Sequence, residues 1–388
     1  MVSTMPVTRE EMIQRATALV PRLRERAERT EQLRRLPDET IADLVDSGLL
    51  RIGNPDRFGG LGLDVDTAFE VTLELGRGCG STAWCYSVLN THNWMLGHWP
   101  EQGQEECFAD SPDTLASSGF DPGRARVEVV PGGYRLSGRW SFSSGCDASR
   151  WVMVGGLTPG GHHLFLVPMA EVTIVDTWFV SGLRGTGSKD LVIDDVFVPS
   201  YRAVEMRRMR DGQTDGWALH GRPSYRAPMA SVNLALEAPI VGMARGAVEA
   251  FSDQLRSRKR PDGTPLTHSV ASQLRLAESS AEADTARCLM RQNTREILDR
   301  ATRGETLTIL DRARYRRDQV FMVKLAVRAI SRLFEAGGGH ALHESNPLQR
   351  FHRDALAASQ HMAIRWDDYA EQYGRVALGL DPAPTALL

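Results

Sequence analysis

The hydrophobic periodicity of this chain changes twice, and the two changes limit the folds that it can adopt. Up to about residue 110, and again from about residue 223, apolar side chains recur every three or four positions, as they do in helices. Between these regions they alternate in short runs separated by Pro-Gly-Gly turns at 131–133 and 159–161, the pattern of an antiparallel β barrel or sandwich. We therefore expect an α+β multidomain protein: an N-terminal helical domain (1–110), a central β domain (111–222) and a C-terminal four-helix bundle (223–388).

The same periodicities predict the individual elements. Thr8 and Glu11 have the spacing of a capping box ahead of a first helix, and a second helix fits 38–47. A pair of helices broken near 76–80 is expected over 67–96, the second of them buried because it is apolar nearly all round. The remaining expected elements are strands over 126–130, 134–142, 151–155, 163–167, 172–175 and 191–198, and helices over 230–256, 268–301, 309–336 and 348–376.

Charge and cysteine content exclude several classes of protein. Lysine and arginine (46) nearly balance aspartate and glutamate (49), so no global basic field argues for nucleic acid. The sequence shows neither an apolar run of membrane-spanning length nor a hydrophobic signal segment before Thr8, so we expect a cytoplasmic protein without a membrane partner. The five cysteines are odd in number and form no Cys-x-x-Cys pair, which favours reduced core thiols over disulfides or zinc. His162 and His163 fit a turn edge, and we predict no metal.

A glycine-rich turn, Gly182-Leu-Arg-Gly-Thr-Gly-Ser-Lys-Asp190, leads directly into the expected strand over 191–198. Such a turn brings backbone amides and a hydroxyl close to a ligand, although a plain hairpin would have the same composition. Upstream lies Gly138-Arg-Trp-Ser-Phe-Ser-Ser-Gly145, and downstream lie Gly337-Gly-Gly339 and Arg350-Phe-His-Arg-Asp354. This order of motifs, with helices, a β domain and a bundle, resembles the acyl-CoA dehydrogenase superfamily over nearly the whole chain.

The C-terminal region departs from a true dehydrogenase. The family's carboxylate base often lies in a Tyr-Glu-Gly-Thr-like segment, and Arg353-Asp-Ala-Leu-Ala-Ala-Ser-Gln-His361 stands in its place. This segment resembles the oxygenase component of two-component flavin monooxygenases, such as 4-hydroxyphenylacetate, secosteroid phenol and polyketide hydroxylases. The resemblance implies reduced FMN or FAD (FMNH2 or FADH2) supplied by a separate NAD(P)H-flavin reductase, O2, and hydroxylation of an aromatic or polyketide-like molecule through a flavin C4a-hydroperoxide. The alternatives are an acyl-CoA dehydrogenase or an amino-sugar N-hydroxylase on the same fold, or a non-enzymatic helical scaffold.

The resemblance also implies which residues bind the cofactor. Ser144, or its neighbour Ser143, occupies the position that hydrogen-bonds flavin N5, with Trp140 or Phe142 beside the isoalloxazine ring. The glycine-rich turn contributes Gly185, Gly187 and Ser188. Contacts to a neighbouring subunit's flavin are implied for the helical half, which predicts a homotetramer, and they fall on Arg258, Gln273 and Gly338.

Two histidines and a serine pair are the candidates for contact with the substrate. By the same resemblance His361 takes a phenolic proton, because a histidine titrates near neutral pH; a solvated or capping histidine is the alternative. His92 resembles the second active-site histidine, or is simply a core residue of an apolar helix. Ser118, or Ser117, resembles the serine near the substrate hydroxyl, with a turn as the alternative. We expect the basic cluster Arg312, Arg314, Arg316 and Arg317 to form a solvated or subunit-facing helix surface.

Overall fold

The structure, a computed structural model, describes residues 7–383. The first six residues, part of the stretch in which the sequence shows no signal segment, lie outside that range. The chain opens with five helices, and the Thr8 hydroxyl accepts a hydrogen bond from Glu11 N–H at 3.1 Å, which confirms the predicted start of the first. These helices are α1 (Arg9–Leu33), α2 (Asp38–Asp46), α3 (Val65–Gly76), α4 (Gly80–Leu96) and α5 (Glu101–Phe108).

Eight strands follow, in two open four-stranded sheets. The first sheet has the order β1-β4-β5-β8 and the second the order β2-β3-β7-β6. The predicted barrel is not confirmed, because neither sheet closes; the two sheets instead pack face to face through a shared apolar core. The strands are β1 (Ala116–Gly119), β2 (Ala125–Val130), β3 (Gly133–Ser143), β4 (Trp151–Thr158), β5 (Gly161–Pro168), β6 (Thr173–Val175), β7 (Lys189–Pro199) and β8 (Ala203–Glu205).

The prediction of a purely antiparallel sheet is wrong at one pair. Strand β1 runs parallel to β4, with Ala116 opposite Trp151 and Gly119 opposite Val154. The chain between them, β2 and β3, belongs to the other sheet, and this long crossover allows a parallel pair that a tight hairpin could not make. Strand β1 was missed because its sequence, Ala-Ser-Ser-Gly, has no apolar alternation.

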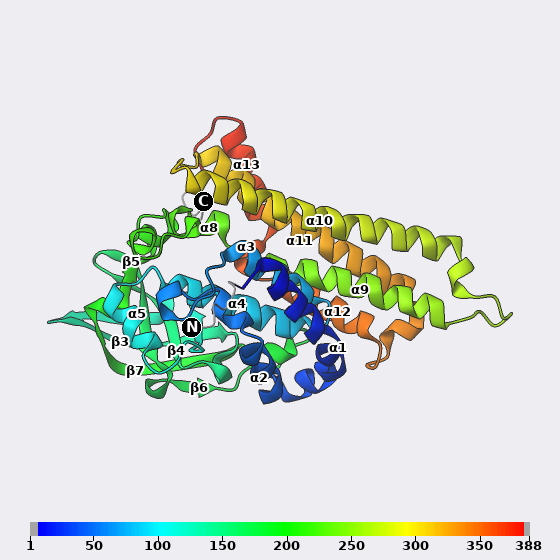
Figure 1. The fold of residues 1–388 in the computed structure, drawn as a ribbon, viewed down its shortest axis with the longest axis horizontal. Helices are drawn as coiled ribbons and strands as arrows, with labels where there is room; N and C mark the ends of the chain where they lie inside the picture. The colour runs from blue at the N-terminus through cyan, green and yellow to red at the C-terminus, as the bar shows by residue number, and fades with distance from the viewer. Residues whose placement is uncertain (1–6, 384–388) are drawn as a thin grey trace, which may run out of the picture.

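The C-terminal half is helical, as predicted, except at two breaks. The helix predicted over 230–256 is interrupted between α8, which ends at Val232, and α9, which begins at Glu237. Long helices α9 to α11 form the bundle with α12, and it extends away from the sheets (Figure 1). The predicted helix over 348–376 is wrong: α12 ends, a short turn follows at Met362–Ile364, and α13 begins. His361 starts this turn by accepting a hydrogen bond at Nδ1 from Ala363 N–H at 3.1 Å. The helices of this half are α6 (Met206–Arg210), α7 (Gly216–His220), α8 (Met229–Val232), α9 (Glu237–Ser257), α10 (Val270–Thr302), α11 (Ile309–Ala336), α12 (Pro347–Ser359) and α13 (Trp366–Ala377).

Helix α4 joins the three regions. All 17 of its residues are buried, and it contacts α3, α9, α12, strand β1 and the glycine-rich turn before β7. Side chains on α4 can therefore meet groups from both the sheets and the bundle. Figure 1 shows α4 between the sheets and the long helices.

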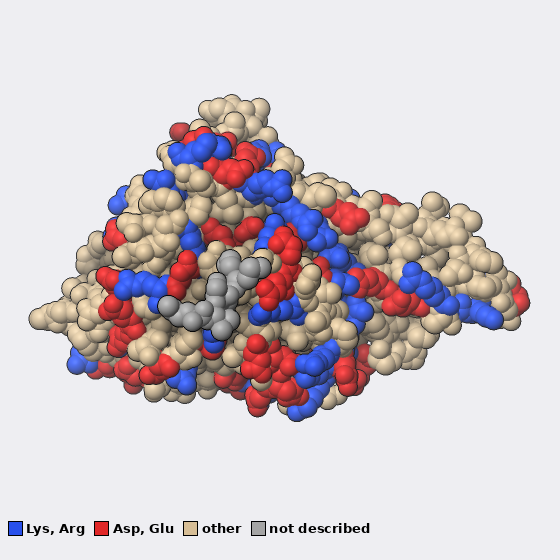
Figure 2. Space-filling view, viewed as in Figure 1, with Lys and Arg blue, Asp and Glu red and all other residues tan. Residues whose placement is uncertain are grey.

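Charges of both signs are mixed on the surface, and most of the cysteines are buried. Basic and acidic side chains are interspersed over the face shown in Figure 2. Four of the five cysteines are buried as predicted, but Cys288 is exposed on α10. No helix within residues 7–383 is both long and apolar enough to cross a bilayer, and no cluster of metal-binding side chains is found over the same range.

Candidate active site

A chain of hydroxyl groups lies where β3 ends and β7 begins. These strands are neighbours in one sheet, with Ser143 opposite Lys189, so the residues just beyond their ends meet. Ser144 Oγ lies 2.7 Å from Ser188 Oγ, which in turn lies 2.7 Å from Thr186 Oγ1. Trp84 on α4 donates from Nε1 to Ser144 Oγ at 3.1 Å. The structure thus places two predicted residues, Ser144 and Ser188, side by side.

The direction of these hydrogen bonds follows from their ends. The Thr186 hydroxyl donates to the Leu183 carbonyl at 2.9 Å, so Thr186 Oγ1 can only accept from Ser188. Ser188 then accepts a hydrogen bond from Ser144, so the single hydroxyl proton of Ser144 is already used. Trp84 Nε1–H donates to one of the two lone pairs on Ser144 Oγ. Among residues 7–383, Ser144 Oγ is therefore left with one lone pair that has no partner, which makes it an acceptor for a further N–H or O–H group.

The glycine-rich turn that carries Ser188 is held from several sides. Asp354 on α12 accepts a hydrogen bond from Leu183 N–H at 2.7 Å, and Trp178 Nε1 donates to the Leu183 carbonyl at 2.9 Å. Leu183 and Gly187 both have a left-handed backbone, with φ of 52° and 55°. A side chain at Gly185 would collide with Thr30 of α1. The predicted glycines therefore serve the close packing of this turn, which fixes Ser188.

Asp354 is fully buried, and its second oxygen, Oδ2, has no hydrogen-bond partner among the described residues. Burial raises the pKa of this carboxyl to about 7, against smaller opposing effects of the Leu183 N–H and of the Arg353 and Arg350 guanidinium groups. Asp354, the aspartate of the Arg353-Asp354 motif, thus contacts the glycine-rich turn through Leu183 N–H.

His361 lies close to the hydroxyl chain, across Trp84. The centroids of the Trp84 and His361 rings are 6.1 Å apart. The imidazole is open to solvent in the single chain, yet the dense protein around it and the positive charge of Arg316 lower its pKa to about 4. Since Nδ1 accepts from Ala363 N–H, a neutral His361 carries its proton on Nε2. His361 therefore presents a hydrogen-bond donor.

His92 has the opposite arrangement. Its Nδ1 lies 2.8 Å from the Ala116 carbonyl, which can only accept, so Nδ1 carries the proton. Nε2 is then an acceptor, and it has no hydrogen-bond partner in the part of the chain that the structure describes. Burial lowers the pKa of His92 to about 4, which keeps it neutral. Its ring meets the edge of Phe120, with the centroids 5.7 Å apart. His92 lies eight residues beyond Trp84 on α4, or about 12 Å along the helix.

The serine pair near His92 belongs to strand β1 rather than to a turn. Ser117 is fully buried, and its Oγ has no partner among the described residues, whereas Ser118 is half-buried. Adjacent strand residues point to opposite faces of a sheet, so only one of the two faces the side of His92.

The two aromatic candidates have different environments. Trp140 is fully buried in the core between the sheets, where its Nε1 donates to the Gly155 carbonyl at 2.9 Å. Of the two residues predicted beside an isoalloxazine ring, Trp140 therefore has no surface open to a ligand in this chain. Phe142 is 71% exposed and packs edge-on against Trp178. Its left-handed backbone, with φ of 68°, and a register shift before Ser143 turn it out of the alternation of β3.

The predicted residues of the helical half lie elsewhere. Arg258 caps the end of α9, Gln273 lies in the first turn of α10 and donates to the Thr267 carbonyl at 2.8 Å, and Gly338 follows α11. In Figure 1 the α9–α10 connection forms the tip of the bundle, far from the sheets. Within one chain these three residues do not join the hydroxyl chain of Ser144.

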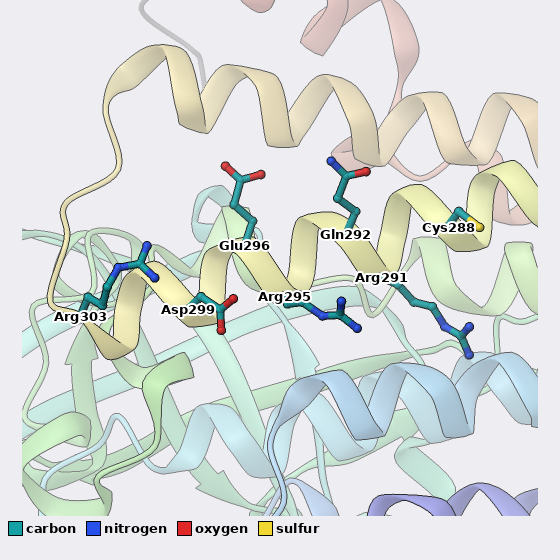
Figure 3. A pocket seen from close by; sticks show the side chains of 7 residues that line it. All are labelled: Cys288, Arg291, Gln292, Arg295, Glu296, Asp299 and Arg303. Carbon is teal, nitrogen blue, oxygen red and sulfur yellow. The ribbon is translucent and has the colours of Figure 1, made fainter.

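Of two surface hollows, one is lined by no residue of the hydroxyl chain and the other meets the chain at Thr186. A groove of about 590 Å³ lies along α10, and Figure 3 shows its lining side chains, Cys288 to Arg303, all on that helix. None of the predicted site residues lines it. A smaller cleft of about 180 Å³ is lined by Gly145 and Thr186 together with Asp38 and Ile41 of α2. The candidate site is therefore defined by the hydrogen bonds that meet at Ser144 Oγ and not by a surface hollow.

Sequence reasoning missed three residues that shape this site. Trp84 lies in the predicted apolar helix and Thr186 in the glycine-rich turn, but their spacing in the sequence does not reveal that their side chains hydrogen-bond to Ser144 and Ser188. Arg316 was assigned to a surface cluster, yet it is only 5% exposed. Its contacts include Ala363, in the break between α12 and α13 that the periodicity did not predict.

Comparison with known proteins places these features in a family. Residues 8–108 match the model described as acyl-CoA dehydrogenase, N-terminal domain, and residues 234–366 match acyl-CoA dehydrogenase, C-terminal domain. The chain is 39% identical to the flavin-dependent monooxygenase, oxygenase subunit HsaA, of Mycobacterium tuberculosis, covering 95% of both chains. It is 34% identical to the FADH(2)-dependent resorcinol hydroxylase, oxygenase component, of a Rhizobium species, covering 96% of this chain and 95% of that protein.

The fold agrees with these sequences. The crystal structure of the HsaA monooxygenase from M. tuberculosis superposes with a TM-score of 0.93 at 37% identity, covering 98% of this chain and 100% of that one. The resemblance inferred from the motifs is thereby confirmed. The chain belongs to the acyl-CoA dehydrogenase family and, within it, to the oxygenase subunits of flavin-dependent monooxygenases.

Proposed function

We propose that this protein uses reduced FMN or FAD and O2 to hydroxylate a phenolic aromatic or polyketide-like small molecule. The observation that carries the proposal is the direction of the hydroxyl chain, which ends in a free lone pair on Ser144. The names of the relatives, an oxygenase subunit and a FADH(2)-dependent resorcinol hydroxylase, support the same chemistry.

The residues present fit a reduced flavin. Reduced flavin carries a hydrogen on N5, whereas oxidised flavin has only a lone pair there, so an acceptor at Ser144 suits the reduced form. The exposed ring of Phe142, next to Trp178, offers an apolar surface for a planar ring system. When bound, the reduced flavin supplies the electrons with which O2 is activated. The chain's own part is to bind, orient and exclude water.

The two histidines divide the remaining work. His92 presents an unprotonated Nε2 and is the group that can take the phenolic proton, which makes the ring a better nucleophile. His361 presents Nε2–H and can donate to an oxygen atom near Ser144. The sequence assigned the proton acceptor to His361; the hydrogen bonds favour His92 for that role.

We further propose that the electrons come from a separate NAD(P)H-flavin reductase. The names of the relatives as a subunit or component support this partner. We also keep the homotetramer and the three-domain division as proposals; in the proposed assembly Arg258, Gln273 and Gly338 contact a neighbouring subunit's flavin. Light scattering tests the assembly: a monomer that binds reduced flavin tightly would contradict it.

The function itself is tested by the preference for the reduced cofactor. Anaerobic titration should show that reduced FMN or FAD binds at least tenfold more tightly than the oxidised form. In Ser144→Ala this ratio should fall toward one, because the acceptor for N5–H is lost. Equal affinity of the unmodified protein for both redox forms would count against the proposed role of the hydroxyl chain.

A further inference from the structure

Arg316 is a buried cation beside the turn that carries His361. It lies on α11, only 5% of its surface is exposed, and its guanidinium group stacks over the Tyr369 ring of α13 with Cζ 4.0 Å from the ring centroid. A buried charge is costly unless it is paired and hydrogen-bonded, so its environment shows what the protein gains from it.

The hydrogen bonds of Arg316 converge on one loop. Nη2 donates to the Ala363 carbonyl at 2.5 Å, and Nη1 donates to the Gln319 side chain and to the Ala230 carbonyl at 3.4 Å. Ala363 is also the residue whose N–H donates to His361 Nδ1. Arg316 thus holds the carbonyl of the same residue whose amide sets the orientation and the tautomer of His361.

The charge of Arg316 is only partly compensated. The nearest carboxylate, that of Glu237 at the start of α9, lies 3.9 Å from Nη1. Burial raises the pKa of Glu237 to about 7, so its negative charge is incomplete near neutral pH. Near this turn Arg365 and Asp368 are paired with each other at 2.6 Å, Lys324 of α11 lies over the Trp366 ring, and Asp367 is exposed on α13. The positive charge of Arg316 therefore acts on His361 from α11.

We propose that Arg316 is a positioning residue for His361: its charge and its hydrogen bond to the Ala363 carbonyl fix the turn and hold the imidazole as a donor through Nε2–H. The effect is specific to this arginine. Its neighbour Arg317 also stacks on α13, with Cζ 4.1 Å over the Tyr373 ring, but its hydrogen bonds go to Asp318 and not to the turn. The inference rests on the proposed role of His361 as a donor.

The test measures His361 in the ligand-free protein. Diethyl pyrocarbonate modifies only the neutral imidazole, and peptide mass spectrometry reports the rate at His361 separately at each pH. In the unmodified protein and in the control Arg317→Gln, the rate at His361 should stay nearly constant from pH 8 to pH 5. In Arg316→Gln it should be about twofold lower at pH 5 than at pH 7, because loss of a nearby positive charge favours protonation by about one pH unit.

Two further results are decisive. Arg316→Lys keeps the charge and should restore the flat pH profile. Its single ammonium group cannot reproduce the hydrogen bonds that the two terminal nitrogens of Arg316 donate. Amide hydrogen exchange over 361–364 should therefore be about tenfold faster than in the unmodified protein. This second measurement stands even if Arg316→Gln does not fold.

A flat profile in Arg316→Gln, an equal fall in Arg317→Gln, or unchanged exchange in Arg316→Lys would overturn the inference. Hydroxylation is measured separately in the same variants. If His361 titrates as expected while hydroxylation is unaffected, then the role proposed for His361 fails and the effect of Arg316 on it stands.

Discussion

Ser144 Oγ lies 2.7 Å from Ser188 Oγ, although 44 positions of sequence separate the two residues. The contact exists because β3 and β7 are neighbours in one sheet and each serine lies just beyond the paired end of its strand. It turns two common polar residues into a directed chain with a free acceptor at one end.

Loss of that acceptor should uncouple the enzyme. We expect Ser144→Ala to release about fivefold more hydrogen peroxide per NADH consumed in the presence of a reductase, since one hydrogen bond is worth about 1 kcal/mol. Ser149→Ala is the matched control, because its hydroxyl donates to the Gly145 carbonyl in the same turn and not to the chain. Equal peroxide release by the two variants would exclude the proposed role of Ser144 as the hydrogen-bond acceptor.

The two histidines should respond differently to replacement by glutamine. His92→Gln should slow hydroxylation about a hundredfold, because an amide cannot take the phenolic proton. His361→Gln should slow it by no more than about tenfold, because the amide N–H can replace the donor. Rapid mixing with reduced flavin and a phenol measures the step directly. The reverse order of the two effects would restore His361 as the base.

Much of this site could be predicted from the sequence, but not its connections. Motif order predicted Ser144, Ser188 and both histidines as candidates, because each lies in a stretch with a recognisable local pattern. The direction of the hydrogen bonds could not be inferred, since it depends on Trp84 and Thr186, which meet Ser144 only after α4 packs against the sheets.

Where the structure differs from the sequence prediction, the cause is again a contact or a backbone conformation that the sequence pattern does not reveal. Trp140 and Phe142 are two residues apart, which in a regular strand puts both on one face; the left-handed backbone at Phe142 breaks this rule. The helix predicted over 348–376 keeps a helical apolar period through a break that His361 and Arg316 create by hydrogen bonds. Periodicity reports burial, and it does not reveal a break of this kind.

Asp354 makes the stability of the fold depend on pH. Its pKa is raised from 3.8 to about 7, so the folded state binds a proton that the unfolded state has lost, and this contribution to stability disappears as pH rises through 7. Asp354→Asn keeps the bond to Leu183 N–H without the charge. Its Tm relative to the unmodified protein should therefore increase between pH 5.5 and 8.5, by about 2–4 °C for each kcal/mol relieved.

Calorimetry of both proteins at the two pH values measures this difference. Asp253→Asn, at an exposed site on α9, is the control and should show no such change. If the difference between Asp354→Asn and the unmodified protein does not depend on pH, the carboxyl does not titrate as its burial suggests.

Trp140 and Phe142 should separate stability from cofactor binding. Trp140→Ala removes a fully buried indole and should lower the free energy of unfolding by about 3–5 kcal/mol. Phe142→Ala, at an exposed position, should change it by no more than about 0.5 kcal/mol while weakening the binding of reduced flavin. Urea unfolding and anaerobic titration test the pair; tight flavin binding by Phe142→Ala would exclude the proposed ring contact.

The most direct test of the proposed function is the fate of labelled oxygen. The purified chain is mixed anaerobically with chemically reduced FMN or FAD and a phenolic substrate, exposed to ¹⁸O₂, and the product is analysed by mass spectrometry. We predict incorporation of one ¹⁸O atom into the product with reduced flavin, and none with NADH and oxidised flavin unless a reductase is added. Hydroxylation driven by NADH and the chain alone, or a product without ¹⁸O, would contradict the proposal.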